Sequence, residues 1–119
     1  MAINPAGAYA YVTNSGSGTI SVFSINSTTG ALTAITGSPF TAASAYSVTL
    51  NPAGTVAYVP TFGSNTVSAY NIDSTTSEIS SAVAGGPLAS GTSTQDIAFN
   101  SSGTFAYSVS SAVLSEQQF

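Results

Sequence analysis

The sequence predicts an all-β protein that is built from a repeated unit of four short antiparallel strands. One phrase occurs three times, beginning at residues 4, 51 and 100. Its copies are Asn4-Pro5-Ala6-Gly7, Asn51-Pro52-Ala53-Gly54 and Asn100-Ser101-Ser102-Gly103. A unit of this length must stack on neighbours of its own kind to bury its apolar faces. No segment has a helical period, and β-branched and aromatic residues fill the apolar positions.

Each copy of the phrase has the chemistry of a type I turn. Asn suits the first position of that turn, Pro fixes φ at the second, and Gly accepts the fourth. A strand is expected after each turn, at residues 9–12, 56–59 and 105–107. In these strands bulky residues alternate with an alanine, so one face carries bulk and the other carries a methyl group. Neighbouring sheets can therefore lie close against both faces.

The rest of each unit is expected to supply three more strands. The second strands alternate apolar and small polar residues, and turns rich in Gly, Ser, Thr, Asn and Pro separate the elements. The predicted second strands are 19–25 and 66–72, the third strands are 31–35 and 78–83, and the closing strands are 46–50 and 95–99. The predicted turns and loops are 15–18, 26–30, 37–40, 63–65, 73–77 and 85–88.

Four short strands per period is the strand count of a propeller blade. The chain divides into blade-like repeats at 1–50 and 51–99, and a partial third repeat with a divergent tail at 100–119. Residues 1–3 match only the end of a closing strand, so the inner strand of the first blade is truncated. We expect about two and a third blades. A propeller needs roughly four to eight blades, so the ring is not closed within one chain.

Several spaced elements resemble the YVTN family of β-propeller repeats. They are Asn4-Pro5-Ala6-Gly7, Tyr11-Val12-Thr13-Asn14, Thr19-Ile20-Ser21-Val22 and Gly30-Ala31-Leu32. The resemblance covers residues 4 to 107, and the second copy departs from it at Pro60-Thr61, where the family has Thr-Asn. It implies blades of four antiparallel strands around an axis, in surface-layer proteins and in lactonase-like enzymes such as the phosphogluconolactonase group. Function varies widely across that set.

The composition disfavours several kinds of partner. The chain has no Lys, Arg, His, Cys or Trp, and its formal charge is -4. Such a surface cannot neutralise phosphates, so we expect no binding to nucleic acid or to anionic lipid. No apolar run approaches the roughly 20 residues of a spanning helix, so we expect no membrane insertion. No segment of signal-peptide composition is present, so either a signal was removed or the chain is a piece of a longer one.

The acidic residues are the only ionisable candidates for catalysis. Lactone hydrolysis needs a general base or a metal-activated water, and usually a cation for an anionic substrate. Because cations are missing, we expect no enzyme activity, no catalytic residue, no metal site and no cofactor. Asp73 and Glu78 could share Ca²⁺ across a turn, but two carboxylates make a poor cage, which favours a solvated turn. Asp96, at the repeat position of Ser47, is interpreted as a strand-edge charge or local acceptor, and Glu116 as a solvated residue of an irregular tail.

Other side chains have two competing interpretations. The tyrosines could stack on carbohydrate, but Tyr11, Tyr58 and Tyr107 share one repeat position, which favours packing between blades. Asn26-Ser27-Thr28 and Asn100-Ser101-Ser102 match the N-glycosylation pattern on turns. Asn26 and Asn100 are therefore candidate glycosylation sites, and the protein is a candidate glycoprotein.

The third copy leaves the template after Tyr107. Its tail could add a strand to a neighbouring molecule, and the candidate assembly residues are Val109, Val113, Leu114 and Phe119. The open blade faces could be covered by further blades of a longer chain, by a ring of several copies, or by head-to-tail contacts that give a filament. The low charge and the hydroxyl-rich surface favour the filament.

From the sequence we therefore expect a non-enzymatic extracellular or cell-surface structural protein. It would assemble into a homo-oligomer or helical polymer through repeat stacking and strand addition. Two alternatives stay open. One is a fragment of a lactonase-like, phosphogluconolactonase-type propeller enzyme, and the other is a surface adhesin module that binds glycans.

Overall fold

The computed structural model describes residues 1–42, 44–61, 63, 65–83, 88–89, 93–110 and 114–117. Within these ranges the chain is all-β, and no helix is present that could span a membrane. The strands are β1 (Ala2–Ile3), β2 (Tyr9–Asn14), β3 (Thr19–Ile25), β4 (Leu32–Ala34), β5 (Phe40–Thr41), β6 (Thr49–Leu50), β7 (Val56–Thr61), β8 (Thr66–Ile72), β9 (Ile79–Ala82), β10 (Leu88–Ala89), β11 (Thr94–Phe99), β12 (Ala106–Ser110) and β13 (Leu114–Gln117).

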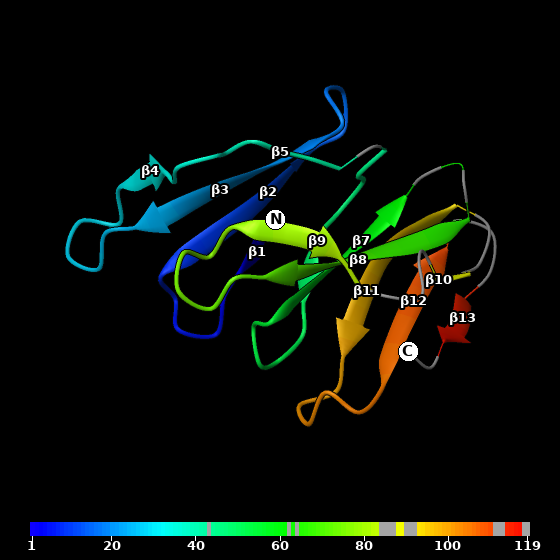
Figure 1. The fold of residues 1–119 in the computed structure, drawn as a ribbon. Helices are drawn as coiled ribbons and strands as arrows, with labels where there is room; N and C mark the ends of the chain where they lie inside the picture. The colour runs from blue at the N-terminus through cyan, green and yellow to red at the C-terminus, as the bar shows by residue number, and fades with distance from the viewer. Residues whose placement is uncertain are drawn as a thin grey trace.

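The strands form three antiparallel sheets that follow one another along the chain (Figure 1). Blade 1 has the order β1-β2-β3-β4, and β5 also pairs with β3. Blade 2 has the order β6-β7-β8-β10, and β9 also pairs with β8. Blade 3 contains β11, β12 and β13. The predicted fold class is therefore confirmed: four-stranded propeller-type blades that do not close into a ring.

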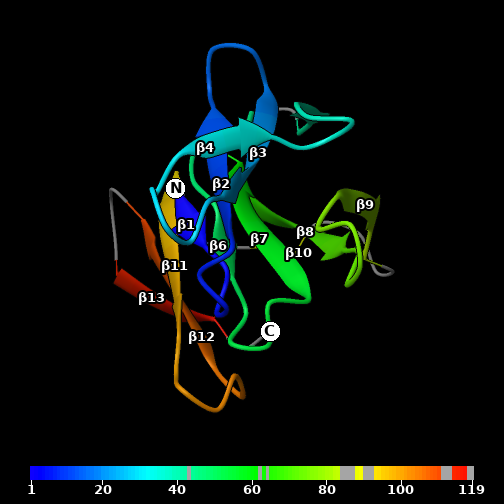
Figure 2. The same ribbon diagram turned by 90° about the vertical axis from the view of Figure 1, so that its left-hand side faces the viewer.

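The sheets are offset from the sequence repeats. The inner strand β6 pairs with β7 in the register Thr49↔Tyr58, so the closing strand of one sequence repeat is the inner strand of the next blade. Inner strands β1, β6 and β11 contact one another in succession, and Figure 2 shows them close together near the middle of the molecule. The blades therefore fan out from a common line of inner strands.

Some strand bounds differ from the sequence prediction. The second strands β3 and β8 have the predicted bounds, whereas the predicted closing strand 46–50 is regular only over β6. Phe40 and Leu88, at the ends of the predicted loops 37–40 and 85–88, lie in the short outer strands β5 and β10, and residues 85–87 lie outside the described ranges. These inner and outer strands depend on pairing with strands far along the chain, which local sequence does not encode. The predicted irregular tail was also wrong, because β13, with Glu116, pairs with β12.

The repeated phrase forms the predicted turn in all three copies. In the first copy, Gly7 N–H donates to Asn4 O at 2.9 Å, and Asn4 Oδ1 accepts from the amides of Ala8 and Tyr9 at 2.8 and 3.1 Å. Asn51 makes the same bonds, and Asn100 accepts from the amide of Phe105 at 3.0 Å. The asparagine side chain thus satisfies backbone donors at the start of the strand that follows the turn, as Asn does in turns generally.

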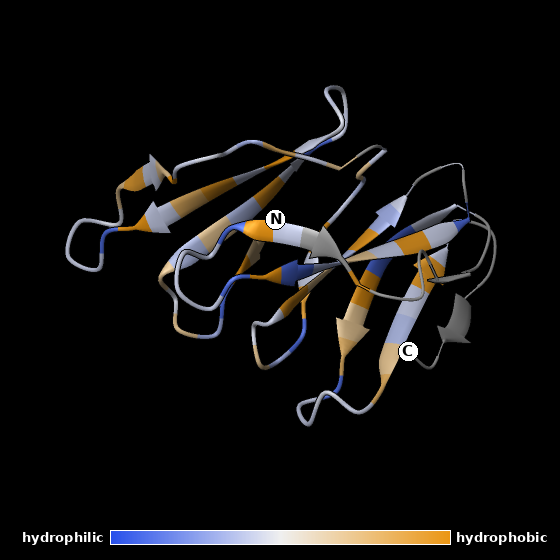
Figure 3. Ribbon diagram, in the orientation of Figure 1, coloured by the Kyte–Doolittle hydropathy of each residue, from blue (hydrophilic) through white to orange (hydrophobic). Residues whose placement is uncertain are grey.

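The core lies between the blades. The strand after each Asn turn (β2, β7 or β12) carries its shared tyrosine on one side, here called the tyrosine face, and its alanine on the other, called the alanine face. Tyr11 on blade 1 packs in one cluster with Ala57 and Val59 of blade 2. A second cluster joins Val67 of blade 2 to blade 3. Figure 3 shows hydrophobic positions along the strands and hydrophilic ones at the turns.

The shared tyrosine position is used in the same way at each junction between blades. Tyr11 is buried, and its hydroxyl donates to Ser77 O of blade 2 at 3.1 Å. The Tyr58 ring lies 5.0 Å from the ring of Phe99 on blade 3, centroid to centroid. The predicted packing between blades is confirmed for both residues. Tyr107 has no following blade in this chain and is 42% exposed.

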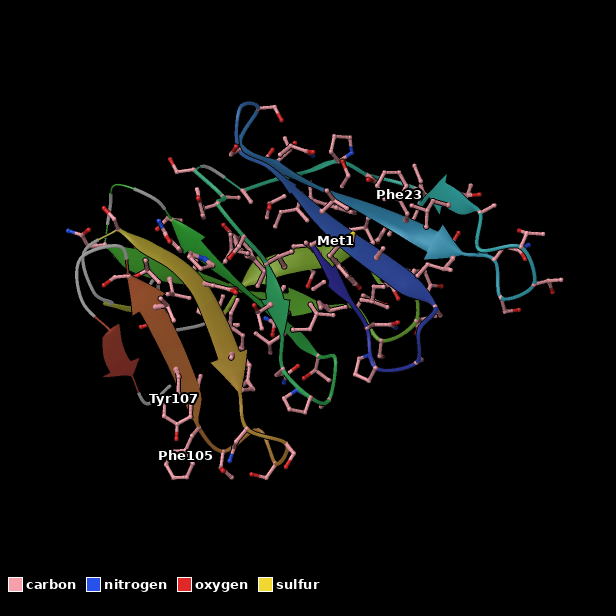
Figure 4. All side chains as sticks on the ribbon, turned by 180° about the vertical axis from the view of Figure 1, so that it is seen from behind. Met1, Phe23, Phe105 and Tyr107 are labelled. Carbon is pink, nitrogen blue, oxygen red and sulfur yellow. The ribbon has the colours of Figure 1, made fainter. Side chains whose placement is uncertain are left out.

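The first and the last blade each have an outer face with exposed residues, at repeat positions that are packed between blades elsewhere in the chain. Ile3 occupies the repeat position of Phe99 and is 53% exposed on the alanine face of blade 1. Phe105, Tyr107 and Val109 are exposed on the tyrosine face of blade 3. Figure 4 shows Phe105 and Tyr107 beside β12, on the other side of the view from Phe23, with Met1 near the middle. Each end is therefore an unpartnered blade face.

The turns of successive blades also pack on one another. A Cβ placed on Gly54 would lie 2.9 Å from Cδ of Pro5, and one placed on Gly103 would lie 3.2 Å from Cδ of Pro52. A Cβ on Gly7 would meet nothing within 4 Å. Gly7 and Gly54 both have φ of 70°, so they differ in their surroundings and not in backbone conformation.

This difference gives a matched test of the contact between turns. Gly7→Ala is expected to lower the free energy of unfolding by about 1–2 kcal/mol, the cost of an L-residue in the left-handed region. Gly54→Ala is expected to cost about 1–3 kcal/mol more, because the new methyl group overlaps the rigid Pro5 ring. Urea unfolding of both variants measures the difference. Equal losses would contradict tight packing between the turns.

A second test concerns the Tyr11 hydroxyl. Tyr11→Phe is expected to cost about 1–2 kcal/mol of unfolding free energy, because the Ser77 carbonyl loses its donor. Tyr107→Phe, at the same repeat position on an open face, is expected to change it by less than about 0.5 kcal/mol. Similar losses in both variants would show that the bond between blades does not stabilise the fold.

The pH dependence of the unfolding free energy is also expected to differ between Tyr11→Phe and Tyr107→Phe. Burial raises the pKa of Tyr11 above its ordinary value of 10.0. The folded state therefore holds this proton more tightly than the unfolded state, and the resulting stability is complete below pH 10 and is lost as pH rises through the higher folded pKa. Tyr11→Phe is expected to remove this alkaline loss, while Tyr107→Phe is expected to keep it. Unfolding midpoints of both variants, measured below and above pH 10, give the size of this alkaline loss of stability.

Candidate functional site

Polar side chains and hollows occur at both ends of the strands. Strand direction brings the Asn turns and the turns after β3 and β8 to one end, called the turn end. The hairpins after β2 and β7 and the crossovers between blades lie at the other end, called the crossover end. Each end has a cavity, and the line of inner strands holds a separate carboxylate.

The turn-end cavity lies between blades 1 and 2 and has a volume of about 260 Å³. Asn4, Pro5 and Tyr11 line it from blade 1, and Asp73, Ser74 and Ser77 line it from blade 2. The Tyr11 hydroxyl is held by the Ser77 carbonyl, as described above. The cavity therefore has a buried ring on its blade 1 side and a carboxylate and hydroxyl groups on its blade 2 side.

Asp73 is exposed and caps its turn. Its Oδ1 accepts from the amides of Thr75 and Thr76, each at 2.8 Å. The bonds from the backbone of Thr76 and then Thr75 lower the pKa of Asp73 below its ordinary 3.8. The turn is therefore stabilised by the charged carboxylate above pH 3.8, and this contribution is lost as pH falls through the lowered pKa. Glu78 accepts from the Thr76 hydroxyl at 3.2 Å, and the described ranges contain no cluster of three or more metal-binding groups.

The corresponding turn of blade 1 is built with an amide. Asn26 Oδ1 accepts from the amides of Thr28 and Thr29, each at 2.9 Å. Asparagine and aspartate therefore cap this turn with the same geometry. Asp73 therefore differs from Asn26 in its negative charge, which lies beside the turn-end cavity.

The crossover-end cavity has a volume of about 320 Å³. Ser15 lines it from the first hairpin, and Ser44, Ala45 and Tyr46 line it from the first crossover. Ser44 has a φ of 57°, and Ser93, at the matching position of the second crossover, has 52°. Left-handed serines thus mark the point at which each crossover enters the next blade. No charged side chain is among the described residues that line this cavity.

Asp96 lies on the inner strand of blade 3 and is exposed. Its Oδ1 accepts from the amide of Ile97 at 2.9 Å, and the Thr49 hydroxyl lies 3.5 Å away. That hydroxyl donates to Ile97 O at 2.8 Å, and the Ser47 hydroxyl donates to Gln95 O at 2.9 Å. Hydroxyl donors of blade 2 therefore bind the backbone of the next inner strand.

Blade 3 cannot repeat this pattern. Asp96 stands where blade 2 has Ser47, and Ala98 stands where it has Thr49. A carboxylate accepts hydrogen bonds but does not donate them, and a methyl group does neither. The inner strand of blade 3 therefore presents an acceptor where the pattern of blade 2 presents a donor. Sequence comparison of the repeats located Asp96, but the hydroxyl pattern that makes it unusual required the structure.

The candidate glycosylation sites differ in their surroundings. Asn26 lies on an exposed turn. Asn100 Nδ2, the atom that would carry a glycan, donates to the hydroxyls of Ser102 and Thr104, each at 2.9 Å. A glycan at Asn100 would disrupt these bonds, whereas no corresponding bond is found for Asn26 among the described residues. Both sites stay predictions.

The candidate assembly tail pairs with its own sheet over β13. Leu114 is opposite the exposed Val109 of β12 in this pairing. Val113 and Phe119 lie outside the described residues. The described part of the tail is thus the third strand of blade 3.

No family model matches the chain, and no curated protein is similar to it in sequence. Solved structures are similar in fold. A candidate 6-phosphogluconolactonase from Bacteroides fragilis matches with a TM-score of 0.78 and 20% identity, over 92% of this chain and 30% of its own. A candidate 6-phosphogluconolactonase from Bacteroides uniformis matches with a TM-score of 0.79 and 19% identity, over 92% and 32%.

A periplasmic gluconolactonase from Pseudomonas aeruginosa matches with a TM-score of 0.72 and 20% identity, over 90% of this chain and 31% of its own. The chain thus spans about a third of the length of these proteins. At this level of identity the likeness establishes the fold alone, an open array of antiparallel propeller-type blades.

These neighbours contradict two expectations from the sequence. The predicted non-enzymatic, filament-forming structural protein and the predicted lack of enzyme activity are both wrong, since the neighbours are named as lactonases and favour the lactonase-like alternative. The error has a physical cause. The absence of Lys, Arg and His from 119 residues does not exclude enzyme activity, because these residues align with less than a third of each neighbour.

Proposed function

We propose that this chain forms blades of a lactonase-like propeller that hydrolyses an uncharged sugar lactone, with Asp96 as the general base. The observation that carries the proposal is the superposition of 92% of the chain on two candidate 6-phosphogluconolactonases, at TM-scores of 0.78 and 0.79. The likeness to a gluconolactonase supports the same class of substrate. The YVTN resemblance of the repeats is consistent with such a propeller.

The charge of the chain favours a substrate without phosphate. Binding of a phosphorylated sugar depends on cations or on a set of aligned backbone donors. This chain has no Lys, Arg or His and carries a formal charge of -4. A neutral lactone avoids the repulsion that a phosphate group would meet, so the gluconolactonase type suits these blades better than the phosphogluconolactonase type.

Asp96 is the carboxylate placed best for chemistry. It projects from an inner strand and is exposed, and the Thr49 hydroxyl of blade 2 lies 3.5 Å from its Oδ1. The carboxylate would accept a proton from the water molecule that adds to the lactone carbonyl. The ring C–O bond then breaks, and the alkoxide that leaves takes up the proton. One lactone and one water give one hydroxy acid.

The exposed end faces support a larger ring. Tyr107 and Ile3 occupy positions that are covered between neighbouring blades elsewhere in the chain. Further blades of a propeller would cover both residues in the same manner. The periplasmic location of one neighbour supports a location outside the cytoplasm for this protein.

The proposal is tested by hydrolysis of glucono-1,5-lactone, followed as acid release at constant pH. The 119-residue chain is expected to hydrolyse it faster than the spontaneous reaction. Asp96→Asn is expected to lose about 10²- to 10⁴-fold in kcat, the usual worth of a positioned base. Glu78→Gln, which keeps an acceptor for Thr76, is the matched control and is expected to retain the activity.

Two outcomes would contradict the proposal. One is a rate no greater than spontaneous hydrolysis. The other is full activity in Asp96→Asn. The 6-phosphorylated lactone provides a second comparison, and we expect a lower kcat/KM for it because of the negative charge of the chain. A higher kcat/KM for the phosphorylated lactone would overturn the assignment to an uncharged substrate.

A further inference from the structure

The turn-end cavity is separate from the surface around Asp96. It lies between the turns of blades 1 and 2, while Asp96 lies on the inner strand of blade 3. At about 260 Å³ it is below the usual range of roughly 300–1,000 Å³ for drug-sized ligands, which suits a single small ring. The proposed lactonase chemistry does not use it.

The side-chain amide of Asn4 lacks the hydroxyl acceptor that the asparagines at the same position of the other two turns have. In the second and third turns, Asn51 Nδ2 donates to the hydroxyl of Thr55, and Asn100 Nδ2 donates to that of Thr104, each at 2.9 Å. The equivalent residue in the first turn is Ala8. The Nδ2 group of Asn4 therefore has no such acceptor among the described residues. Asn4 lines the cavity.

The opposite wall supplies acceptors. Asp73 carries a negative charge at neutral pH, and two backbone amides bind its Oδ1. Ser74 and Ser77 line the same wall, and serine hydroxyls both donate and accept hydrogen bonds. The cavity thus has an amide donor on blade 1 facing a carboxylate and hydroxyl groups on blade 2.

The remaining lining is apolar. Pro5 and Ala53 come from the two Asn turns, and Ile72 ends β8. Tyr11 lies at the buried side, with its hydroxyl already bound to Ser77 O. Few polar groups placed among apolar ones are typical of small-molecule sites, where the polar groups fix the orientation of the ligand.

We propose that the turn-end cavity binds one ring of a neutral sugar or a similar cyclic polyol. Hydroxyls of the ligand donate to the Asp73 carboxylate, an oxygen of the ligand accepts from Asn4 Nδ2, and its C–H face lies on Pro5 and Ile72. An anion is repelled by Asp73. The cavity is also a poor site for a hard cation, because it supplies one carboxylate, whereas Ca²⁺ takes about six to eight oxygen ligands.

The repeats supply variants that change the site without changing the turns. Asp73→Asn removes the charge, and blade 1 shows that Asn26 caps the same turn with the same two bonds. Ala8→Thr adds the hydroxyl that Asn51 and Asn100 bind in their own turns, so it is expected to occupy Asn4 Nδ2. Asn26→Asp is the control, because it places a carboxylate on the equivalent turn of blade 1.

The test is a titration of the ¹⁵N-labelled chain with methyl glucoside, methyl galactoside and myo-inositol, followed by amide chemical shifts. At least one probe is expected to give saturable shifts at residues 4–6, 53–55 and 73–77, and none at 95–99. Asp73→Asn is expected to weaken binding by about tenfold or more, since hydrogen bonds to charged groups are the stronger ones. Ala8→Thr is expected to weaken it several-fold, and Asn26→Asp is expected to leave it unchanged.

Three results would overturn this inference. They are the absence of saturable shifts with all three probes, unchanged binding in Asp73→Asn, and saturation of the same amides by Ca²⁺ alone at lower concentration. The lactone assay is independent of this titration. Loss of activity in Asp96→Asn with normal probe binding would support the site at the inner strand and leave this one standing.

Discussion

The packing of a tyrosine of one blade against the alanine face of the next determines how the blades are arranged. Ala57 and Ala106, which face the tyrosines of the preceding blades, are each no more than 1% exposed. A larger side chain at these positions would hold the sheets apart, because protein interiors leave no space for extra methylene groups. The other contacts between blades, such as the bonds from the Ser47 and Thr49 hydroxyls to β11, form only when the sheets are this close.

The sequence predicted the parts of the fold that are local. The Asn turns and the second strands follow from residues close together in the chain, and β3 and β8 have the predicted bounds. The outer strands β5 and β10 are two residues long and exist only because β3 and β8 provide partners. Such pairing depends on closure of long loops, which local propensity does not report.

The candidate sites were partly visible in the sequence. Asp73 and Asp96 stood out because the other repeat has Asn26 and Ser47 at the same places. Their chemical meaning depends on groups that the fold brings near, such as the Thr49 hydroxyl for Asp96 and the first Asn turn for Asp73. The substitution of Ala8 for a threonine was also visible, but its effect on Asn4 required the hydrogen bonds of the other two turns.

The offset between sequence repeats and sheets has a genetic consequence. Each Asn turn joins the end of one repeat to the start of the next, and the two strands that it joins pair within one blade. A duplication or deletion of one whole period therefore leaves every sheet with an inner strand, wherever the breakpoints fall. Repeat proteins consist of units that contact mainly their neighbours, so blade number can change during evolution without a new interface having to arise.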